Sequence, residues 1–254
     1  IKGLGTDRFG FLTIVWMVIG YFSLFDLGLG RALTKLVAER LSSDKEQEIP
    51  PLVWTATALM LILGTVGGLI LGLISPWLVY SMFKIPDELQ SESLYALLIL
   101  AASIPVCVVT AGFVGILAAK QRFDLITWVR IPTGALAYLS PIAVLPFSKS
   151  LVMVTAVLFL IRIITLLINL VQCLLVLPVL RVSFRIKRAV MRPLLSLGGW
   201  MTVTNVVSPL MVSLDRFFIG AIISVSAVAY YTTPFEAVTK LWTIPFSLTG
   251  VLFP

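Results

Sequence analysis

Long runs of apolar residues alternate with short polar links along the whole chain. A helix needs about 20 predominantly apolar residues to cross the hydrocarbon core of a bilayer. Seven segments reach this length with few or no charges, and their pattern predicts seven membrane-spanning helices. The predicted helices are Phe9–Gly30, a stretch within Ile49–Phe83, a stretch within Ser93–Ala119, Phe123–Pro146, Leu151–Leu180, Leu194–Ile222, and a segment from Val225 to the end of the sequence.

The composition supports this assignment and narrows the class of protein. Hydrophobic residues make up 59% of the 254 residues and charged residues only 12%, with a mean hydropathy of +1.06. Soluble domains average about 25% charged residues, so we expect an all-α, polytopic transmembrane helix bundle with the bilayer as its solvent. Histidine is absent, which removes the usual proton shuttle and the commonest metal ligand. We expect no metal site and no cofactor.

Lysines and arginines of the short links are distributed unequally between the two sides of the membrane. One side has eleven of them, namely Arg31, Lys35, Arg40, Lys45, Lys120, Arg122, Arg181, Arg185, Lys187, Arg188 and Arg192. The other side has four, namely Lys2, Arg8, Lys84 and Lys149. The richer side is cytoplasmic by the positive-inside rule. The net charge of +7 therefore indicates topology and attraction to membrane lipids, and we expect no nucleic acid partner.

Two pairs of glycines predict local features of the helices: a close contact between two helices, and a loosened helix end. Gly64 and Gly68 have the four-residue spacing that brings two membrane helices into close contact. Gly28 and Gly30 follow Asp26 and are expected to loosen the end of the first predicted helix.

A polar stripe is predicted on the fifth apolar segment. Arg162, Thr165, Asn169 and Gln172 are spaced by three, four and three residues, which puts them on one narrow face of a helix. Arg162 lies about 16 Å into the membrane, close to the midplane of a core roughly 30 Å thick. We expect the stripe to line an internal cavity that binds substrate, because arginine is a costly residue to bury in a membrane. The alternative is a set of hydrogen bonds that join helices.

Further charges within the predicted helices are candidates for substrate binding, coupling or gating. Glu236 and Lys240 are four residues apart in the order that favours a helical ion pair, and both lie near mid-depth. Asp215 and Arg216 point about 100° apart, so Asp215 is expected to find a partner on another helix, and so is Asp26. Arg31 and Arg130 are expected to anchor their helices at the membrane surface.

Three short motifs resemble a known family. The first is Leu24-Phe25-Asp26-Leu27-Gly28-Leu29-Gly30, followed by basic residues; the second is Leu214-Asp215-Arg216-Phe217-Phe218-Ile219-Gly220 with Tyr230-Tyr231-Thr232-Thr233-Pro234; the third is Leu4-Gly5-Thr6-Asp7-Arg8-Phe9-Gly10. In order and spacing they resemble the bacterial O-antigen and polysaccharide repeat-unit flippases (Wzx-like) of the multidrug/oligosaccharidyl-lipid/polysaccharide (MOP) exporter superfamily.

This resemblance implies a MATE-like fold of two six-helix lobes, of which the chain is a fragment holding helices two to eight. Residues 1–182 are then the N-terminal lobe without its first helix, 183–192 a basic cytoplasmic linker between the lobes, and 193–254 the truncated start of the C-terminal lobe.

The resemblance also implies a function. The protein is expected to be no enzyme but a multi-pass transporter of the bacterial inner (plasma) membrane. It would flip an undecaprenyl-diphosphate-linked oligosaccharide by alternating access, with H⁺ or Na⁺ as a possible coupling cation. One alternative is a cation-coupled multidrug exporter of the same superfamily, in which membrane carboxylates should dominate. A membrane-embedded glycan polymerase or ligase is a further alternative, but the links are too short for the polar loops of such an enzyme.

Overall fold

The computed structural model describes residues 28–43, 45–83, 85–144, 150–181 and 185–241, together with Gly10 and Thr13. The regular structure of these residues is helical throughout. The α-helices are α2 (Leu29–Ser42), α3 (Ile49–Trp77), α4 (Asp87–Ala119), α5 (Phe123–Val144), α6 (Leu151–Val176), α7 (Arg188–Ile222) and α8 (Val225–Leu241). Shorter helical turns are η2 (Glu46–Glu48), η3 (Leu78–Met82) and η4 (Pro178–Arg181).

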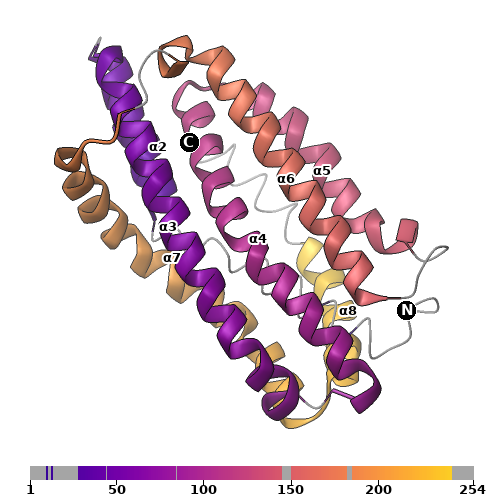
Figure 1. Cartoon of the computed structure of the whole chain (residues 1–254). Helices are drawn as coiled ribbons and strands as arrows, with labels where there is room; N and C mark the ends of the chain where they lie inside the picture. The colour runs from indigo at the N-terminus through magenta and orange to yellow at the C-terminus, as the bar shows by residue number, and fades with distance from the viewer. Residues whose placement is uncertain are drawn as a thin grey trace.

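The helices pack side by side as an elongated bundle (Figure 1). Helix α4 lies at its centre and contacts α2, α3, α5 and α6, while α7 packs against α2, α3 and α8. Buried leucine, isoleucine, valine and alanine side chains of α2, α3, α4 and α6 form one continuous core. The all-α helix bundle expected from the sequence is therefore confirmed.

Three of the described helical stretches are long and apolar enough to cross a membrane, judged by length and composition. They are Glu46–Met82, α4 and α6. Helix α5 is less apolar than these because it contains Asp124 and Arg130. On α3, Leu73 is 81% exposed and Trp77 58% exposed, and an outer face of such side chains is suited to contact with lipid tails.

Helix ends follow local sequence signals. Pro50 and Pro51 occupy the first turn of α3, where the missing N–H groups of proline need no partner. Helix α4 begins after Pro86 with two acidic residues in its first turn, which suits the positive end of the helix dipole. At the start of α6 the hydroxyl of Ser150 accepts a hydrogen bond from the Val152 N–H, and the carboxylate of Glu92 on α4 accepts one from the Leu151 N–H.

The basic residues after the first predicted helix lie on a helix, whereas the sequence predicts a loop there. Gly28 has a φ of 68°, a left-handed conformation that favours glycine, and α2 begins at the next residue. Helix α2 is amphipathic: it buries Leu29, Leu33 and Leu36 and exposes Lys35. A helix whose apolar face is only half its surface lacks the continuous apolar run that reveals a membrane helix. Apart from Gly10 and Thr13, residues 9–27 of the first predicted helix lie outside the described residues.

Glycines join α3 closely to α4, as the Gly64 and Gly68 spacing predicts. A Cβ atom added at Gly64 would lie 2.6 Å from the Cα atom of Pro105, and one added at Gly68 would lie 2.6 Å from the carbonyl oxygen of Ala101. Both neighbouring atoms belong to the backbone of α4, so they cannot rotate away. The two helices can be this close only because these positions have no side chain.

We expect Gly64→Ala to destabilise the protein by about 1–3 kcal/mol, the usual penalty for overpacking a tight contact. Thermal unfolding of the purified full-length protein in detergent measures this effect. Gly199→Ala on α7 is the matched control, because an added Cβ there would meet no atom within 4 Å. An unchanged melting temperature for Gly64→Ala would contradict the close packing of α3 on α4.

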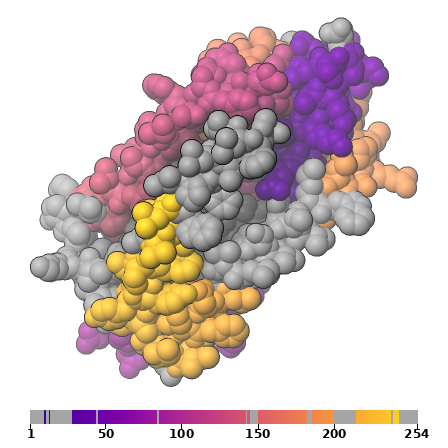
Figure 2. Space-filling view, turned by 180° about the vertical axis from the view of Figure 1, so that it is seen from behind, coloured from indigo at the N-terminus to yellow at the C-terminus, as the bar shows by residue number. Residues whose placement is uncertain are grey.

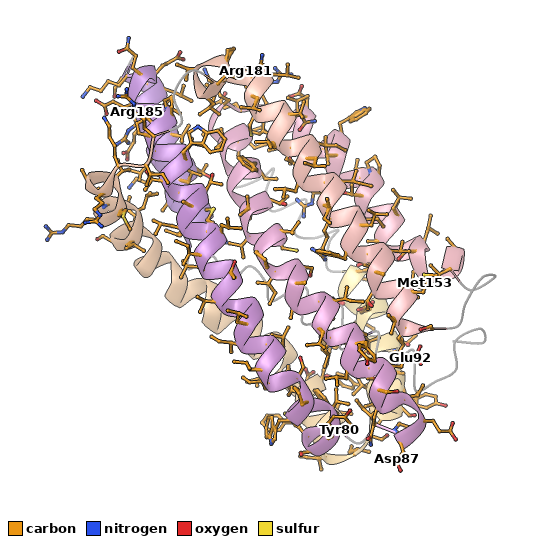
Figure 3. All side chains as sticks on the ribbon, in the orientation of Figure 1. Tyr80, Asp87, Glu92, Met153, Arg181 and Arg185 are labelled. Atoms are coloured by element: carbon orange, nitrogen blue, oxygen red, sulfur yellow. The ribbon has the colours of Figure 1, made fainter. Side chains whose placement is uncertain are left out.

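The two ends of the bundle differ in charge in the way the sequence predicts. Arg181 and Arg185 lie at one end of the molecule, and Asp87 and Glu92 lie towards the other (Figure 3). Ion pairs cross-link the basic end: Lys120 contacts Glu46 at 3.2 Å, and Arg40 contacts Glu48 at 3.6 Å. The first end is therefore the one that the positive-inside rule assigns to the cytoplasm.

Single-cysteine labelling in intact cells tests this orientation. We expect Ser91→Cys, at the exposed start of α4, to react with a membrane-impermeant thiol reagent added outside the cell. Ser43→Cys, exposed at the end of α2, should react only after the membrane is opened. The reverse pattern would overturn the topology.

Candidate functional site

A cavity of about 530 Å³ lies between α4, α5 and α6. Its size is within the range of about 300–1,000 Å³ that is usual for ligand pockets. The side chains around it include two arginines and three threonines, and no carboxylate. The lining residues are Cys107, Thr110, Arg130, Thr133, Gly134, Ala137, Leu158, Ile161, Arg162 and Thr165.

Arg162 extends from the middle of α6 into this cavity. Its guanidinium Nη1 donates a hydrogen bond to the Sγ atom of Cys107 on α4, at 2.7 Å. Thr165 lies one turn further along α6, and its hydroxyl donates to the carbonyl of Ile161 at 2.7 Å. Because that hydroxyl satisfies its own donor locally, its oxygen lone pairs remain as acceptors. The guanidinium of Arg162, by contrast, carries five N–H donors and no acceptor.

Arg130 lines the same cavity, whereas its position near the start of the predicted helix indicates a surface anchor. Arg130, Thr133, Gly134 and Ala137 are spaced by three, one and three residues, so they share one face of α5. The periodicity that identifies the stripe on α6 also holds for this face. The cavity therefore brings two permanently charged guanidinium groups together on membrane-embedded helices.

The remaining members of the polar stripe lie beyond the cavity. Asn169 is buried, with 1% exposure, and its Nδ2 donates to the carbonyl of Thr165 at 2.8 Å. The Oδ1 atom of Asn169 and the Oε1 atom of Gln172 are buried and lack a hydrogen-bond partner among the described residues. Arg162 and Thr165 are thus cavity-lining residues, while Asn169 and Gln172 are not among the residues that line it.

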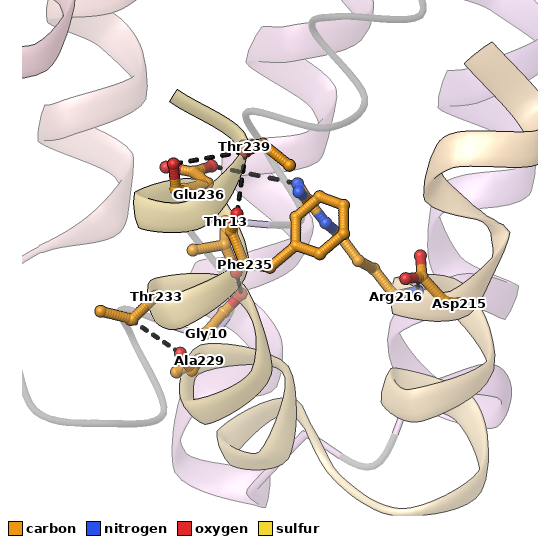
Figure 4. Close-up of polar contacts among 9 residues, drawn as sticks. All are labelled: Gly10, Thr13, Asp215, Arg216, Ala229, Thr233, Phe235, Glu236 and Thr239. Atoms are coloured by element: carbon orange, nitrogen blue, oxygen red, sulfur yellow. Dashed lines mark hydrogen bonds and ion pairs between the residues drawn. The ribbon is translucent and has the colours of Figure 1, made fainter. Parts of the chain in front are cut away.

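A second group of polar side chains joins α7 to α8, which lie together when the molecule is seen from behind (Figure 2). Figure 4 shows the Arg216 side chain extending from α7 towards Glu236 and Phe235 on α8. Its Nη1 lies 4.0 Å from Oε1 of Glu236, and its guanidinium carbon lies 5.1 Å from the centre of the Phe235 ring. The side chain of Arg216 is 13% exposed, so it is held between the helices instead of reaching the membrane surface.

Glu236 and Lys240 do not form the ion pair that their spacing predicts. Glu236 faces Arg216, and the Nζ atom of Lys240 lies 5.3 Å from the centre of the Tyr138 ring on α5. A contact between neighbouring residues of one helix is worth only about 0.2–0.5 kcal/mol, so partners on adjacent helices determine where both side chains point. Tyr138 follows Ala137 in the sequence but points about 100° away from it, and neither Tyr138 nor Lys240 is among the residues that line the cavity.

Asp215 has the interhelical partner expected of it. The hydroxyl of Tyr231 on α8 donates a hydrogen bond to its Oδ2 atom, and the backbone N–H of Arg216 donates to its Oδ1 at 2.8 Å. The ring of Tyr231 stacks on that of Phe235, with centroids 5.7 Å apart. Of the other candidate gating residues, Arg31 is exposed on α2, and Asp26 lies outside the described residues.

Comparison with known proteins gives the site its context. Residues 2–254 match the family model described as "Polysaccharide biosynthesis protein". The chain is 30% identical over 254 residues to a protein of Shigella flexneri named "Putative O-antigen transporter". This match covers all of the present chain and 59% of the relative, so the chain spans less than two thirds of that protein's length.

Solved structures of similar fold are transporters. An inward-facing multidrug resistance MATE family transporter of the MOP superfamily superposes with a TM-score of 0.80 at 19% identity, over 96% of this chain and 56% of that one. A MOP superfamily transporter from Pyrococcus furiosus gives a TM-score of 0.71 at 18% identity, over 94% and 54% of the two chains. The fold is that of multi-pass membrane transporters, and the chain belongs to the polysaccharide biosynthesis protein family.

Proposed function

We propose that the protein flips a lipid-linked oligosaccharide across the bacterial inner membrane. The substrate is an undecaprenyl-diphosphate-linked oligosaccharide, carried from the cytoplasmic to the periplasmic leaflet for the synthesis of O-antigen, capsule or exopolysaccharide. Membership of the polysaccharide biosynthesis family and the transporter fold support this class of activity.

The observation that carries the proposal is the pairing of Arg130 and Arg162 at one cavity. The diphosphate of the substrate is the part that crosses a low-dielectric region at the greatest energetic penalty. Guanidinium groups match phosphate oxygens in charge and in hydrogen-bond geometry, and such charge-assisted bonds are about twice as strong as neutral ones. Lys240 on α8 is a further cation that contacts α5, through the ring of Tyr138.

Alternating access supplies the movement. Several of the helices contain prolines, which weaken the backbone hydrogen bonding and permit bending: Pro76 in α3, Pro105 in α4, Pro132 and Pro141 in α5, and Pro234 in α8. The helices α2 and α3 contact α7, and these contacts must break and reform as the two lobes rock.

A cation-coupled multidrug exporter is the second candidate, because the chain shares its fold with a MATE family transporter. Such an exporter would bind cationic drugs, for which a cavity with two arginines and no carboxylate among its lining residues is poorly suited. The carboxylates Asp215 and Glu236 between α7 and α8 are candidates for binding a coupling cation, H⁺ or Na⁺, in either kind of transporter.

Reconstitution of the full-length protein in proteoliposomes tests the proposal. A polyprenyl-diphosphate oligosaccharide with a fluorescent sugar is placed in both leaflets, and a membrane-impermeant glycosidase reports the pool that becomes accessible. We expect accessibility to rise with time only in vesicles that contain the protein. If the vesicles leave this lipid in place and export a cationic dye under an ion gradient, the second candidate is correct.

A further inference from the structure

The segment that joins α6 to α7 forms a strongly basic surface together with the first turns of α7. Arg181, Arg185, Lys187, Arg188 and Arg192 are all exposed. No aspartate or glutamate occurs anywhere between Asp124 and Asp215 in the sequence, so the linker itself contains no negatively charged side chain. We call these five cations and the exposed Ile186 among them the linker surface; the Ile186 side chain is 58% exposed.

Several other cations at the same end of the molecule have acidic partners. Lys35 pairs with Glu39 at 3.9 Å, Lys120 with Glu46 at 3.2 Å, and Arg122 with Asp124 at 2.8 Å. Within the described part of the chain, none of the five linker cations forms an ion pair. A cluster of cations that repel one another without internal compensation is typical of a site whose counter-charge comes from a partner.

The described residues on either side of 182–184 are held against α3. The indole Nε1 of Trp54 on α3 donates a hydrogen bond to the carbonyl oxygen of Leu180 at 3.3 Å. The backbone N–H of Lys187 donates to the hydroxyl of Thr55 on the next position of α3, at 3.0 Å. The side chain of Leu180 is buried in the core. These contacts hold the backbone at Leu180, next to Arg181, and at Lys187. The charges of these two cations therefore have a defined location.

We propose that the linker surface binds the headgroups of anionic phospholipids in the cytoplasmic leaflet. It begins five residues after the membrane helix α6, within reach of the headgroup region. Four to eight cations directly cytoplasmic of a membrane helix suffice for recognition of anionic lipid. The exposed Ile186 between Arg185 and Lys187 offers an apolar contact to the upper acyl chains. This inference rests on the membrane topology and is independent of the transported substrate.

Lipid quenching in nanodiscs tests the proposal on the full-length protein. A fluorophore attached to Ala189→Cys, an exposed position within the linker surface, is quenched by phosphatidylglycerol or by phosphatidylcholine with a nitroxide on the upper acyl chain. We expect phosphatidylglycerol to bind at least tenfold more tightly at low salt, with a preference that falls as salt rises. Each cation near a membrane surface contributes on the order of fivefold in affinity.

Two matched triple variants separate a specific surface from net charge. The linker variant has Arg185→Gln, Lys187→Gln and Arg188→Gln, and the control has Lys35→Gln, Lys120→Gln and Arg122→Gln. Both lose three positive charges at the same end of the molecule. The preference for phosphatidylglycerol should fall at least tenfold in the linker variant and stay within twofold in the control. Equal losses in both variants, or an unchanged preference in the linker variant, would overturn the proposal.

Inorganic pyrophosphate distinguishes a lipid surface from a diphosphate site. Sodium pyrophosphate and sodium chloride are added at equal ionic strength, and release of the quenching phosphatidylglycerol is recorded. Equal release is expected if the linker surface recognises headgroups by charge. If pyrophosphate releases the lipid at a tenfold lower ionic strength than chloride, the surface is a diphosphate site and the lipid assignment is wrong.

Discussion

Replacing Arg162 with alanine is expected to abolish transport without removing the protein from the membrane. A charged group that loses its buried ionic partner costs about 2–5 kcal/mol, which corresponds to a rate at least roughly thirtyfold lower. Arg162→Lys keeps the charge but loses the bidentate geometry of the guanidinium, so partial function should remain. Surface polysaccharide in a flippase-null cell, quantified together with the membrane level of each variant, measures the effect.

Arg122→Ala is the control for this experiment. Arg122 is also a cation near a membrane helix, but its guanidinium is exposed and already paired with Asp124. It should support polysaccharide assembly at the wild-type level. Arg130→Ala is expected to reduce transport as well, since Arg130 contributes the second guanidinium of the cavity. If Arg162→Ala is present at a normal level and complements fully, Arg162 is structural and the diphosphate does not bind there.

Linking α3 to α7 at Phe83 and Phe217 should stop transport completely. The two rings lie 5.8 Å apart at their centroids, and the Phe83 ring packs on Gly220, where an added Cβ would lie 3.3 Å from it. Phe83 directly follows the helical turn η3, at the end of the bundle assigned to the periplasm. In a transporter that opens alternately to the two sides, this contact must separate for the substrate to leave.

The test uses the double variant Phe83→Cys/Phe217→Cys and a short bifunctional thiol reagent that reduction cleaves. Transport should fall to background after cross-linking and return after reduction, whereas each single variant treated in the same way should remain active. The pair Glu46→Cys/Lys120→Cys is the control, because both residues lie in the predicted N-terminal lobe, with side-chain ends 3.2 Å apart. Full transport by the cross-linked Phe83/Phe217 protein would show that α3 and α7 stay together throughout the cycle.

Apolar runs predict the membrane-embedded parts of this fold well and the parts outside the membrane poorly. The run within Ile49–Phe83 corresponds to α3 and η3, and Leu151 and Phe123 are the observed first residues of α6 and α5. Helix α4 begins at Asp87, six residues before the predicted segment, and α7 begins at Arg188 instead of Leu194. In both cases a polar first turn continues the helix into water, where apolarity no longer marks it. The amphipathic helix α2 also lacks the apolar run that would predict it.

Helical periodicity also predicts which residues share a face, but it does not reveal the neighbouring helix. The spacing of Arg162 and Thr165 correctly predicts that they share a face of α6. The cavity that they line also needs Cys107 and Arg130, which come from other helices. Glu236 has two candidate cationic partners, Lys240 on its own helix and Arg216 on α7. Sequence spacing favours Lys240. The observed partner of Glu236 is Arg216, because the packing of α7 on α8 brings these two side chains together.

The presence of both Arg130 and Arg162 at one cavity has a consequence for the electrical behaviour of the transport cycle. A diphosphate diester carries about two negative charges, so the proposed loaded cavity is close to neutral and its reorientation should be nearly insensitive to the membrane potential. The empty cavity retains two positive charges, each of which is worth about 2.3 kcal/mol per 100 mV across the full membrane. With the cell interior negative, the voltage draws the empty cavity towards the cytoplasm, where the next substrate is waiting.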